Sequence, residues 1–431
     1  MFNKPLFINF WNSVICLFLV LMTFVGLTSP ASAEGSRELV ANGGYRPYLE
    51  LDPNSKTANI VLRAIIKVFA KEGEVVNLGG SIHDSLNDPT QDIIYRSPTG
   101  IEGSCDVLKT GFGYIDTVEK ETIGPFPNQG GYDPCTFTAT EEGIYEIEFY
   151  MSKSAIENTN PRQKTATADF LKKERQGNSI AAWDITVLNE NGEEQKGRAF
   201  TNFLPLRMGG KKPFLNSEFF VLSNTGYLYK TQLNGAKPLN FLFFSNNKGF
   251  QNENGQPLFQ SVKEQEIGKN VFVHAPNALD TDTDVTNKIF FNHPDEDDLP
   301  TEAALPGGNS TWLLLPPIPL PEVTDFKFTG NEGTVGQMGA NPLSGIFSFN
   351  SSMVGHYFLS IDINNNTIYG DGKDRMLKGQ VVEGNNTIAW NGLDGEDQVL
   401  AAQNLPFNAT LNLIDDVHFP FLILKIISRV S

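Results

Sequence analysis

The stretch C-T-F-T-A-T-E-E-G-I-Y-E-I-E-F at 135–149 decides the fold class, because its second half alternates apolar and acidic side chains. Tyr145, Ile147 and Phe149 fall on one face of an extended chain, and the two glutamates between them fall on the other. The pattern predicts an antiparallel strand whose apolar face meets a core and whose glutamates point outward.

Similar short runs recur along the chain and set the wider expectation. They are rich in Val, Ile, Phe and Tyr and are bounded by Gly, Asn, Asp and Pro. The clearest lie at 59–69, 182–188, 219–222 and 241–244, and Asn-Thr-Gly at 224–226 predicts a hairpin turn. Helix signals are scarce. The sequence therefore predicts an all-β chain of tandem antiparallel β-sandwich, or Ig-like, domains.

The first 33 residues have the order of a secretory signal peptide. Lys4 precedes an almost wholly apolar run at 13–27, and Ala-Ser-Ala at 31–33 supplies small residues for cleavage. The apolar run is short for a spanning helix, which needs about 20 residues. The alternative is an uncleaved membrane anchor. We expect a secreted or cell-surface protein whose mature chain starts at Glu34 and contains no membrane span.

Length and charge limit the remaining possibilities. Hydrophobic residues make up 40% and charged residues 19% of the chain, which suits folded domains rather than disorder. A single core seldom grows to this size, so the mature chain should divide. We predict a β-sandwich with a disulfide at 34–190, a second β-rich domain at 191–319 and an Ig-like domain at 320–431, the last preceded by a proline-rich linker. The net charge of −17 disfavours a nucleic acid or an anionic membrane surface as a partner. The partner that we expect is an extracellular or cell-envelope protein or polysaccharide.

Two cysteines remain after Cys16 is removed with the signal peptide. Cys105 and Cys135 would enter an oxidising compartment, where a disulfide between them is the natural outcome. A metal site built on two cysteines would need further ligands, and no histidine lies close to either cysteine in the sequence. We therefore predict a structural disulfide.

The C-terminal region carries a family resemblance. A strand ending at Trp390 is followed by Asn-Gly-Leu-Asp-Gly at 391–395. This pattern resembles the bacterial Ig-like module of flagellar hook-capping type, which also occurs in large secreted and cell-surface proteins. The resemblance implies that Trp390 caps the core, that Gly392, Asp394 and Gly395 shape the next loop, and that the role is structural or adhesive. Where that family shows a Gly-x-Tyr strand, this chain has Ala-Ala-Gln-Asn-Leu at 401–405.

Two loops carry side-chain oxygens suited to Ca²⁺, a cation that takes six to eight oxygen ligands. The first candidate set is Asp362, Asn364, Asn366, Asp371 and Asp374, and the second is Asp280, Asp282 and Asp284. The first loop is not an EF-hand, because Thr367 and Lys373 stand where that motif needs Gly and Glu. The alternative is that Asp and Asn form turns by bonding their own backbone.

No complete catalytic motif is present, so the sequence nominates no catalytic and no cofactor-binding residue. The histidines form no metal-binding spacing, and no nucleophile elbow or phosphate loop occurs. We expect Trp183, Trp312 and Trp390 to pack in cores. The leading hypothesis is a non-enzymatic exported protein with a structural or adhesive role and calcium-stabilised loops. The alternative is a calcium-dependent carbohydrate-binding protein or an accessory module of an extracellular hydrolase. A cleft with converging carboxylates between the first two regions would favour an enzyme.

Overall fold

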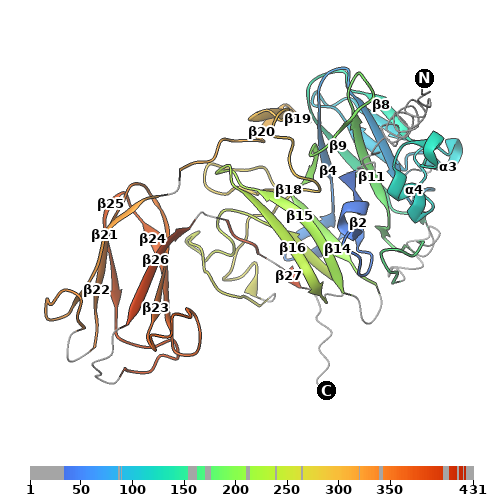
Figure 1. The fold of residues 1–431 in the computed structure, drawn as a ribbon. Coiled ribbons are helices and arrows are strands. Elements are labelled where there is room, and N and C mark those ends of the chain that lie inside the picture. The colour runs from blue at the N-terminus through green and yellow to red at the C-terminus, as the bar shows by residue number, and fades with distance from the viewer. Residues whose placement is uncertain are drawn as a thin grey trace, which may run out of the picture.

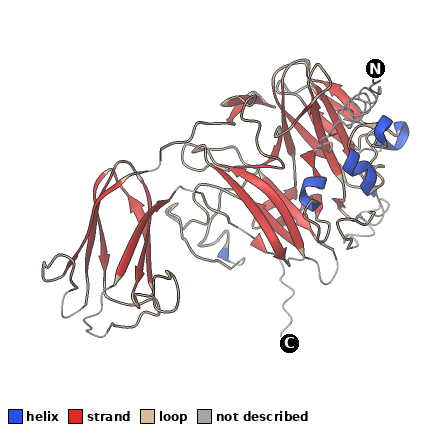
Figure 2. Cartoon of the chain, in the orientation of Figure 1, coloured by secondary structure: helices blue, strands red, loops and turns tan. Residues whose placement is uncertain are grey.

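The fold is almost entirely β, which confirms the predicted class (Figure 2). The structure is a computed structural model, which describes residues 34–85, 88, 90–153, 163–169, 176–209, 214–237, 240–263, 266–319, 321–338, 343–400, 407–414, 417–420 and 422–423. The predicted signal peptide at 1–33 lies outside these residues. The helical elements are short: α2 (Ser36–Val40), α3 (Val107–Thr110), α4 (Val118–Ile123) and the 3-10 turn η1 (Pro127–Gln129). In the described parts of the chain, no helix is long and apolar enough to span a bilayer.

Three antiparallel sheets form the larger body of the molecule (Figure 1). The five-stranded sheet contains β1 (Glu34–Gly35), β11 (Trp183–Leu188), β5 (Val75–Gly80), β8 (Cys135–Thr138) and β12 (Glu194–Gln195). The six-stranded sheet contains β10 (Ser179–Ile180), β2 (Tyr48–Thr57), β14 (Phe203–Arg207), β17 (Asn240–Phe244), β27 (Leu422–Ile423) and β3 (Ile60–Arg63).

The eight-stranded sheet is the structural centre of this body. Its strands are, in order, β16 (Leu228–Ala236), β15 (Leu215–Leu222), β18 (Lys288–Phe290), β13 (Ala199–Thr201), β4 (Ile66–Ala70), β9 (Gly143–Phe149), β6 (Ile93–Arg96) and β7 (Glu102–Cys105). Within it β13 pairs directly with β4. Strands from both sides of residue 190 thus share this sheet, and the predicted boundary there does not coincide with a boundary between sheets.

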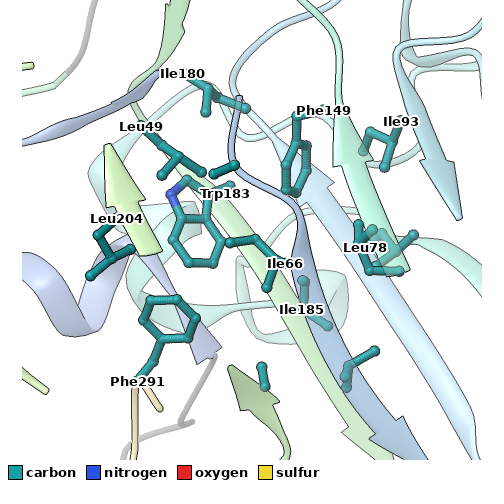
Figure 3. Packing of buried hydrophobic residues seen from close by; sticks show 14 of the residues in the cluster. Leu49, Ile66, Leu78, Ile93, Phe149, Ile180, Trp183, Ile185, Leu204 and Phe291 are labelled. Atoms are coloured by element: carbon teal, nitrogen blue, oxygen red, sulfur yellow. The ribbon is translucent and has the colours of Figure 1, made fainter. Parts of the chain in front are cut away.

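One face of the eight-stranded sheet packs into the main core. Tyr145, Ile147 and Phe149 are buried there, as the alternating pattern predicts. The indole of Trp183 lies in the same core, and its ring centre is 4.8 Å from that of Phe291 (Figure 3). Burying an aromatic side chain of this kind stabilises a fold by roughly 1.5–3 kcal/mol. Packing in this core holds the eight-stranded sheet in place, and the other face of that sheet carries the candidate site.

The predicted disulfide is present and joins two sheets. Cys105 ends β7 of the eight-stranded sheet, and Cys135 begins β8 of the five-stranded sheet. Their Cα atoms are 6.2 Å apart, within the range that a disulfide bridges. The bond therefore ties together two elements that are distant in sequence.

The C-terminal region forms a separate β-sandwich of two three-stranded sheets. One sheet contains β21 (Val323–Gly330), β22 (Gly345–Ser351) and β25 (Gly384–Trp390), and the other β24 (Arg375–Val381), β23 (Gly355–Asp362) and β26 (Asn408–Ile414). Trp390 is buried in its core, and the indole Nε1 donates to the Leu393 carbonyl at 3.0 Å. Gly392 has a φ of 73°, and a Cβ there would collide with the Leu343 carbonyl oxygen. The local packing suits the roles expected of these residues, while the hook-capping resemblance stays a prediction.

The chain connects this sandwich to the larger body twice. On the way out, the exposed linker at 316–319 is held by a bond from the Ile318 amide to the Thr225 carbonyl, 2.9 Å. On the way back, His418 exchanges two backbone hydrogen bonds with Asn246, at 2.7 and 3.0 Å, and β27 then pairs with β17. Residues 417–420 and 422–423, predicted as part of the C-terminal domain, therefore lie against the larger body, and β27 extends its six-stranded sheet. Backbone pairing with that sheet is the physical reason.

Candidate functional site

The first predicted calcium loop connects β23 to β24. Asp362 and Asp374, at its two ends, are buried. The Asp362 carboxylate accepts backbone N–H bonds from Asn366 and Thr367, at 3.2 and 2.8 Å. The Asp374 carboxylate accepts from Ile363 and Gly370, at 3.1 and 3.0 Å. These bonds fold the loop by the turn chemistry of Asp and Asn.

The remaining members of this loop are held by one another. The Nδ2 atoms of Asn364 and Asn366 donate to the Asp371 carboxylate, at 3.1 and 2.7 Å. The amide nitrogens, rather than the oxygens that Ca²⁺ needs, therefore face Asp371. Across the described residues, no three His, Cys, Asp or Glu side chains are grouped to hold a metal ion. The arrangement fits a hydrogen-bonded turn as it stands, and calcium binding here stays a prediction.

The three aspartates of the second predicted calcium set do not converge. Asp280 accepts from the Thr286 amide at 2.9 Å and from Trp312 Nε1 at 3.0 Å. Asp284 instead pairs with Lys248 Nζ at 3.3 Å and accepts from Gln251 at 2.8 Å, and Asp282 is exposed. Each side chain serves a different neighbour, so the structure gives this set no common centre.

A cleft of about 850 Å³ is the more prominent feature, and it lies in the larger body. Its floor is the outer face of the eight-stranded sheet. Its walls are the end of β3, the segment 276–280 and the hairpin of β19 (Glu302–Leu305) and β20 (Asn309–Trp312). Residues from before and after position 190 line it together. Its size falls within the range typical of small-molecule sites.

The register of the sheet explains why this face is half apolar and half charged. Lys67 lies opposite Phe200 and Glu146, and Phe200 lies opposite Phe290, so these side chains share one face. At one end of the face, Phe200 and Phe290 pack against the apolar side chains of the hairpin segment. At the other end, Lys67, Glu146 and Glu148 line the cleft instead. The cleft is the space left above them.

Two lysines lie on the cleft floor. The Nζ atom of Lys67 is 4.0 Å from Glu146. Lys288 is only 2% exposed; its Nζ donates to Thr311 Oγ1 at 3.0 Å and lies 3.5 Å from the centre of the Trp312 ring. Burial lowers the pKa of Lys288 well below its usual range, an effect that Asp280 opposes and Lys67 reinforces. Burial also lowers the pKa of Lys67.

Four carboxylates line the cleft, and three of them are held closely by a neighbour, while Glu146 has only the 4.0 Å contact with Lys67. Glu148 pairs with Arg63 and, at 3.0 Å, with Arg96. Asp280 accepts from Trp312 and Thr286, and Glu302 at the rim accepts from Ser310. Both glutamates of β9 point away from the main core, as the alternation predicts, but Glu148 is buried between arginines rather than exposed to solvent.

Trp312 packs at the edge of a core rather than within one. It is only half-buried and lines the cleft, whereas Trp183 and Trp390 are buried as expected. Sequence reasoning named Asp280 but missed Lys67, Lys288 and the cleft itself. The available signal was a single lysine within an otherwise apolar strand, which occurs in I-I-K-V-F at 65–69 and in K-I-F-F at 288–291.

Comparisons with known proteins add little to this picture. No protein-family model and no curated protein matches the chain. One solved structure with a similarity is that of a DUF4785 family protein from Legionella pneumophila, at 10% identity, covering 88% of each chain with a TM-score of 0.17. A score this low carries no argument about the fold or function of this chain.

Proposed function

We propose that this chain is an exported, non-enzymatic binding protein with an adhesive or structural role outside the cytoplasm, and that the cleft is its binding site. One observation carries the proposal: the cleft has the volume of a ligand site, yet three of its four carboxylates are engaged by arginines, an indole, a hydroxyl or the backbone, and the fourth, Glu146, faces Lys67. Most glycoside hydrolases need a carboxylic acid placed to exchange a proton with the substrate. Carboxylates held in this way are better suited to binding a ligand than to transferring a proton to it.

A carbohydrate is the second candidate, favoured by the chemistry of the lining. Amides and hydroxyls project from several sides, among them Asn202, Asn277, Asn309 and Thr301, and the indole of Trp312 supplies an aromatic surface. Polar groups fix orientation in such sites, and aromatic faces give contact area. None of the residues of the first calcium loop lines the cleft. Sugar binding there would therefore not draw on calcium at 362–374.

The test uses residues 34–431 as purified protein. It would be incubated with isolated bacterial envelope polysaccharide and with envelope proteins, and co-sedimentation would be measured beside the release of reducing sugar. Binding without release is the expected result. Release of reducing sugar in proportion to the concentration of the added protein would overturn the non-enzymatic role. A lack of co-sedimentation with either material would overturn the binding role.

Export is tested separately. The full-length chain would be expressed in a bacterial host, and the protein recovered outside the cytoplasm would be subjected to N-terminal sequencing. A new terminus at Glu34 is expected from the Ala-Ser-Ala pattern at 31–33. Retention of the full chain in the cytoplasm would contradict the proposal.

A further inference from the structure

We propose that Lys288 and Lys67 form an anion subsite in the cleft, and that the ligand is a short saccharide bearing a carboxylate. The inference deepens the binding role proposed above and rests on it.

Lys288 is a buried lysine whose ammonium form has incomplete partners. An ammonium group has three N–H donors. One is accepted by Thr311, and the Trp312 face covers another side. Considering the described residues, no carboxylate oxygen lies within 4.0 Å of its Nζ. Burying a charge without a direct ion pair is costly, and burial does lower the pKa of this group, although the more distant Asp280 carboxylate opposes the shift. An anionic ligand group would supply the close ion pair that the described carboxylates do not make.

Lys67 adds a second cation on the same floor. It enters from β4, and its nearest carboxylate, on Glu146, is 4.0 Å away, which is a loose contact. The repulsion between Lys67 and Lys288 contributes to the lowered pKa of Lys288. A carboxylate in the cleft beside both ammonium groups would reduce this repulsion. It would also leave the Arg63–Glu148 pair undisturbed.

The rest of the cleft argues for a sugar as the carrier of that carboxylate. The walls present amides and hydroxyls around the two lysines, and Trp312 and Pro276 give flat apolar surface. Polyols with apolar ring faces match such a mixture. The net charge of −17 would repel a long polyanion from the surface around the cleft. A short acidic saccharide has hydroxyls for the polar walls, a ring face for the apolar surface, and few enough charges to limit repulsion by the acidic chain.

The experiment compares digalacturonate with the neutral galactose disaccharide of the same linkage. Residues 34–431 would be titrated with each sugar by calorimetry at low ionic strength, where charge interactions are least screened. The variants are Lys288→Met and Lys67→Met. Lys230→Met is the matched control, because Lys230 is a surface lysine paired with Glu218 outside the cleft.

We expect digalacturonate to bind at least about tenfold more tightly than the neutral sugar, a ratio that corresponds to about 1.4 kcal/mol. Each cleft variant should remove most of this preference, and Lys230→Met should keep it. Circular dichroism would show whether Lys288→Met folds; Lys67→Met, at a more accessible lysine, tests the subsite if it does not.

Three results would overturn the inference. The first is equal affinity for the acidic and neutral sugars, and the second is unchanged affinity in both cleft variants. The third is an absence of binding by either sugar. In that third case, positive co-sedimentation with envelope material would leave the proposed binding role standing without the acidic sugar, and negative co-sedimentation would remove both.

Discussion

The Nζ atom of Lys288 lies 3.5 Å from the centre of the Trp312 ring. This contact joins β18 of the eight-stranded sheet to the β19–β20 hairpin that walls the cleft. A cation against an indole face is worth up to about 2 kcal/mol when desolvated. Trp312 also donates through Nε1 to Asp280 at 3.0 Å, so one side chain holds two walls of the cleft in place.

Replacing Trp312 should separate these two contributions. Trp312→Phe keeps an aromatic ring but loses the hydrogen bond to Asp280, and we expect the free energy of unfolding to fall by about 1 kcal/mol. Trp312→Ala also loses the ring and its contact with Lys288, and we expect a fall of about 2–3 kcal/mol. Urea unfolding followed by circular dichroism measures both. Equal losses would show that the ring face contributes nothing.

Reduction of the Cys105–Cys135 bond should destabilise the larger body. The two cysteines are 30 residues apart, and closing a loop of this size restricts the unfolded chain by about 3–4 kcal/mol in the chain-entropy model. Urea unfolding of the Cys105→Ser/Cys135→Ser double variant should show this loss. Dithiothreitol should lower the stability of the wild type by a similar amount and leave the double variant unchanged. A response of the double variant to dithiothreitol would point to another cause.

The sequence predicted the local elements better than their partners. The alternation at 145–149 sufficed to place β9 and its core face, because side-chain period is a local property. The pairing of β4 with β13 joins segments more than a hundred residues apart, and no local pattern specifies it. For the same reason, no local pattern in the sequence predicts the cleft. Lys67 and Lys288 become neighbours only when β4 and β18 enter one sheet on either side of β13.

The buried ion pair between Arg46 and Glu121, a residue of α4, should contribute strongly to the free energy of unfolding. The guanidinium donates two hydrogen bonds of 2.7 Å to the carboxylate, and both side chains are almost fully buried. Glu121→Gln would leave Arg46 with a buried charge and should cost about 3–5 kcal/mol. Glu119→Gln, on the exposed side of the same α4 helix, should stay within about 0.5 kcal/mol of wild type. Thermal unfolding of both variants makes the comparison, and similar melting temperatures would contradict it.

Buried carboxylates should make the protein less stable as pH rises. Burial raises the pKa of Asp184 to about 7, against the hydrogen bonds from Tyr132 and Thr186 that lower it. In the unfolded chain this group has a pKa of about 3.9. The folded state thus binds more protons between these values. The free energy of unfolding should therefore fall as pH rises from about 4 to 7.

A pair of variants isolates this effect from the general repulsion of an acidic chain. Asp184→Asn removes the titrating group, so its unfolding free energy should depend less on pH than that of the wild type. Asp282→Asn removes the same charge from an exposed position and should keep the wild-type slope. Urea unfolding at intervals between pH 5 and pH 8 provides the slopes. A wild-type slope in Asp184→Asn would show that Asp184 does not titrate in this range.

Ca²⁺ should bind the loop at 362–374 and stabilise the C-terminal sandwich. Without the ion, Asn364 and Asn366 donate their amide groups to Asp371. Binding Ca²⁺ at 362–374 would require those amides to turn their oxygens inward, and it would supply a counter-charge to the buried Asp362 carboxylate. A ligand at a hundredfold excess over its Kd stabilises the folded state by about 2.7 kcal/mol. The melting temperature of the C-terminal sandwich should therefore rise by several degrees with Ca²⁺ relative to excess chelator.

Asp362→Asn should abolish the rise, and Asp325→Asn, an exposed position in β21 of the same sandwich, should retain it. If the wild type shows no rise, then the hydrogen bonds already present complete the loop, and these residues act as turn formers only.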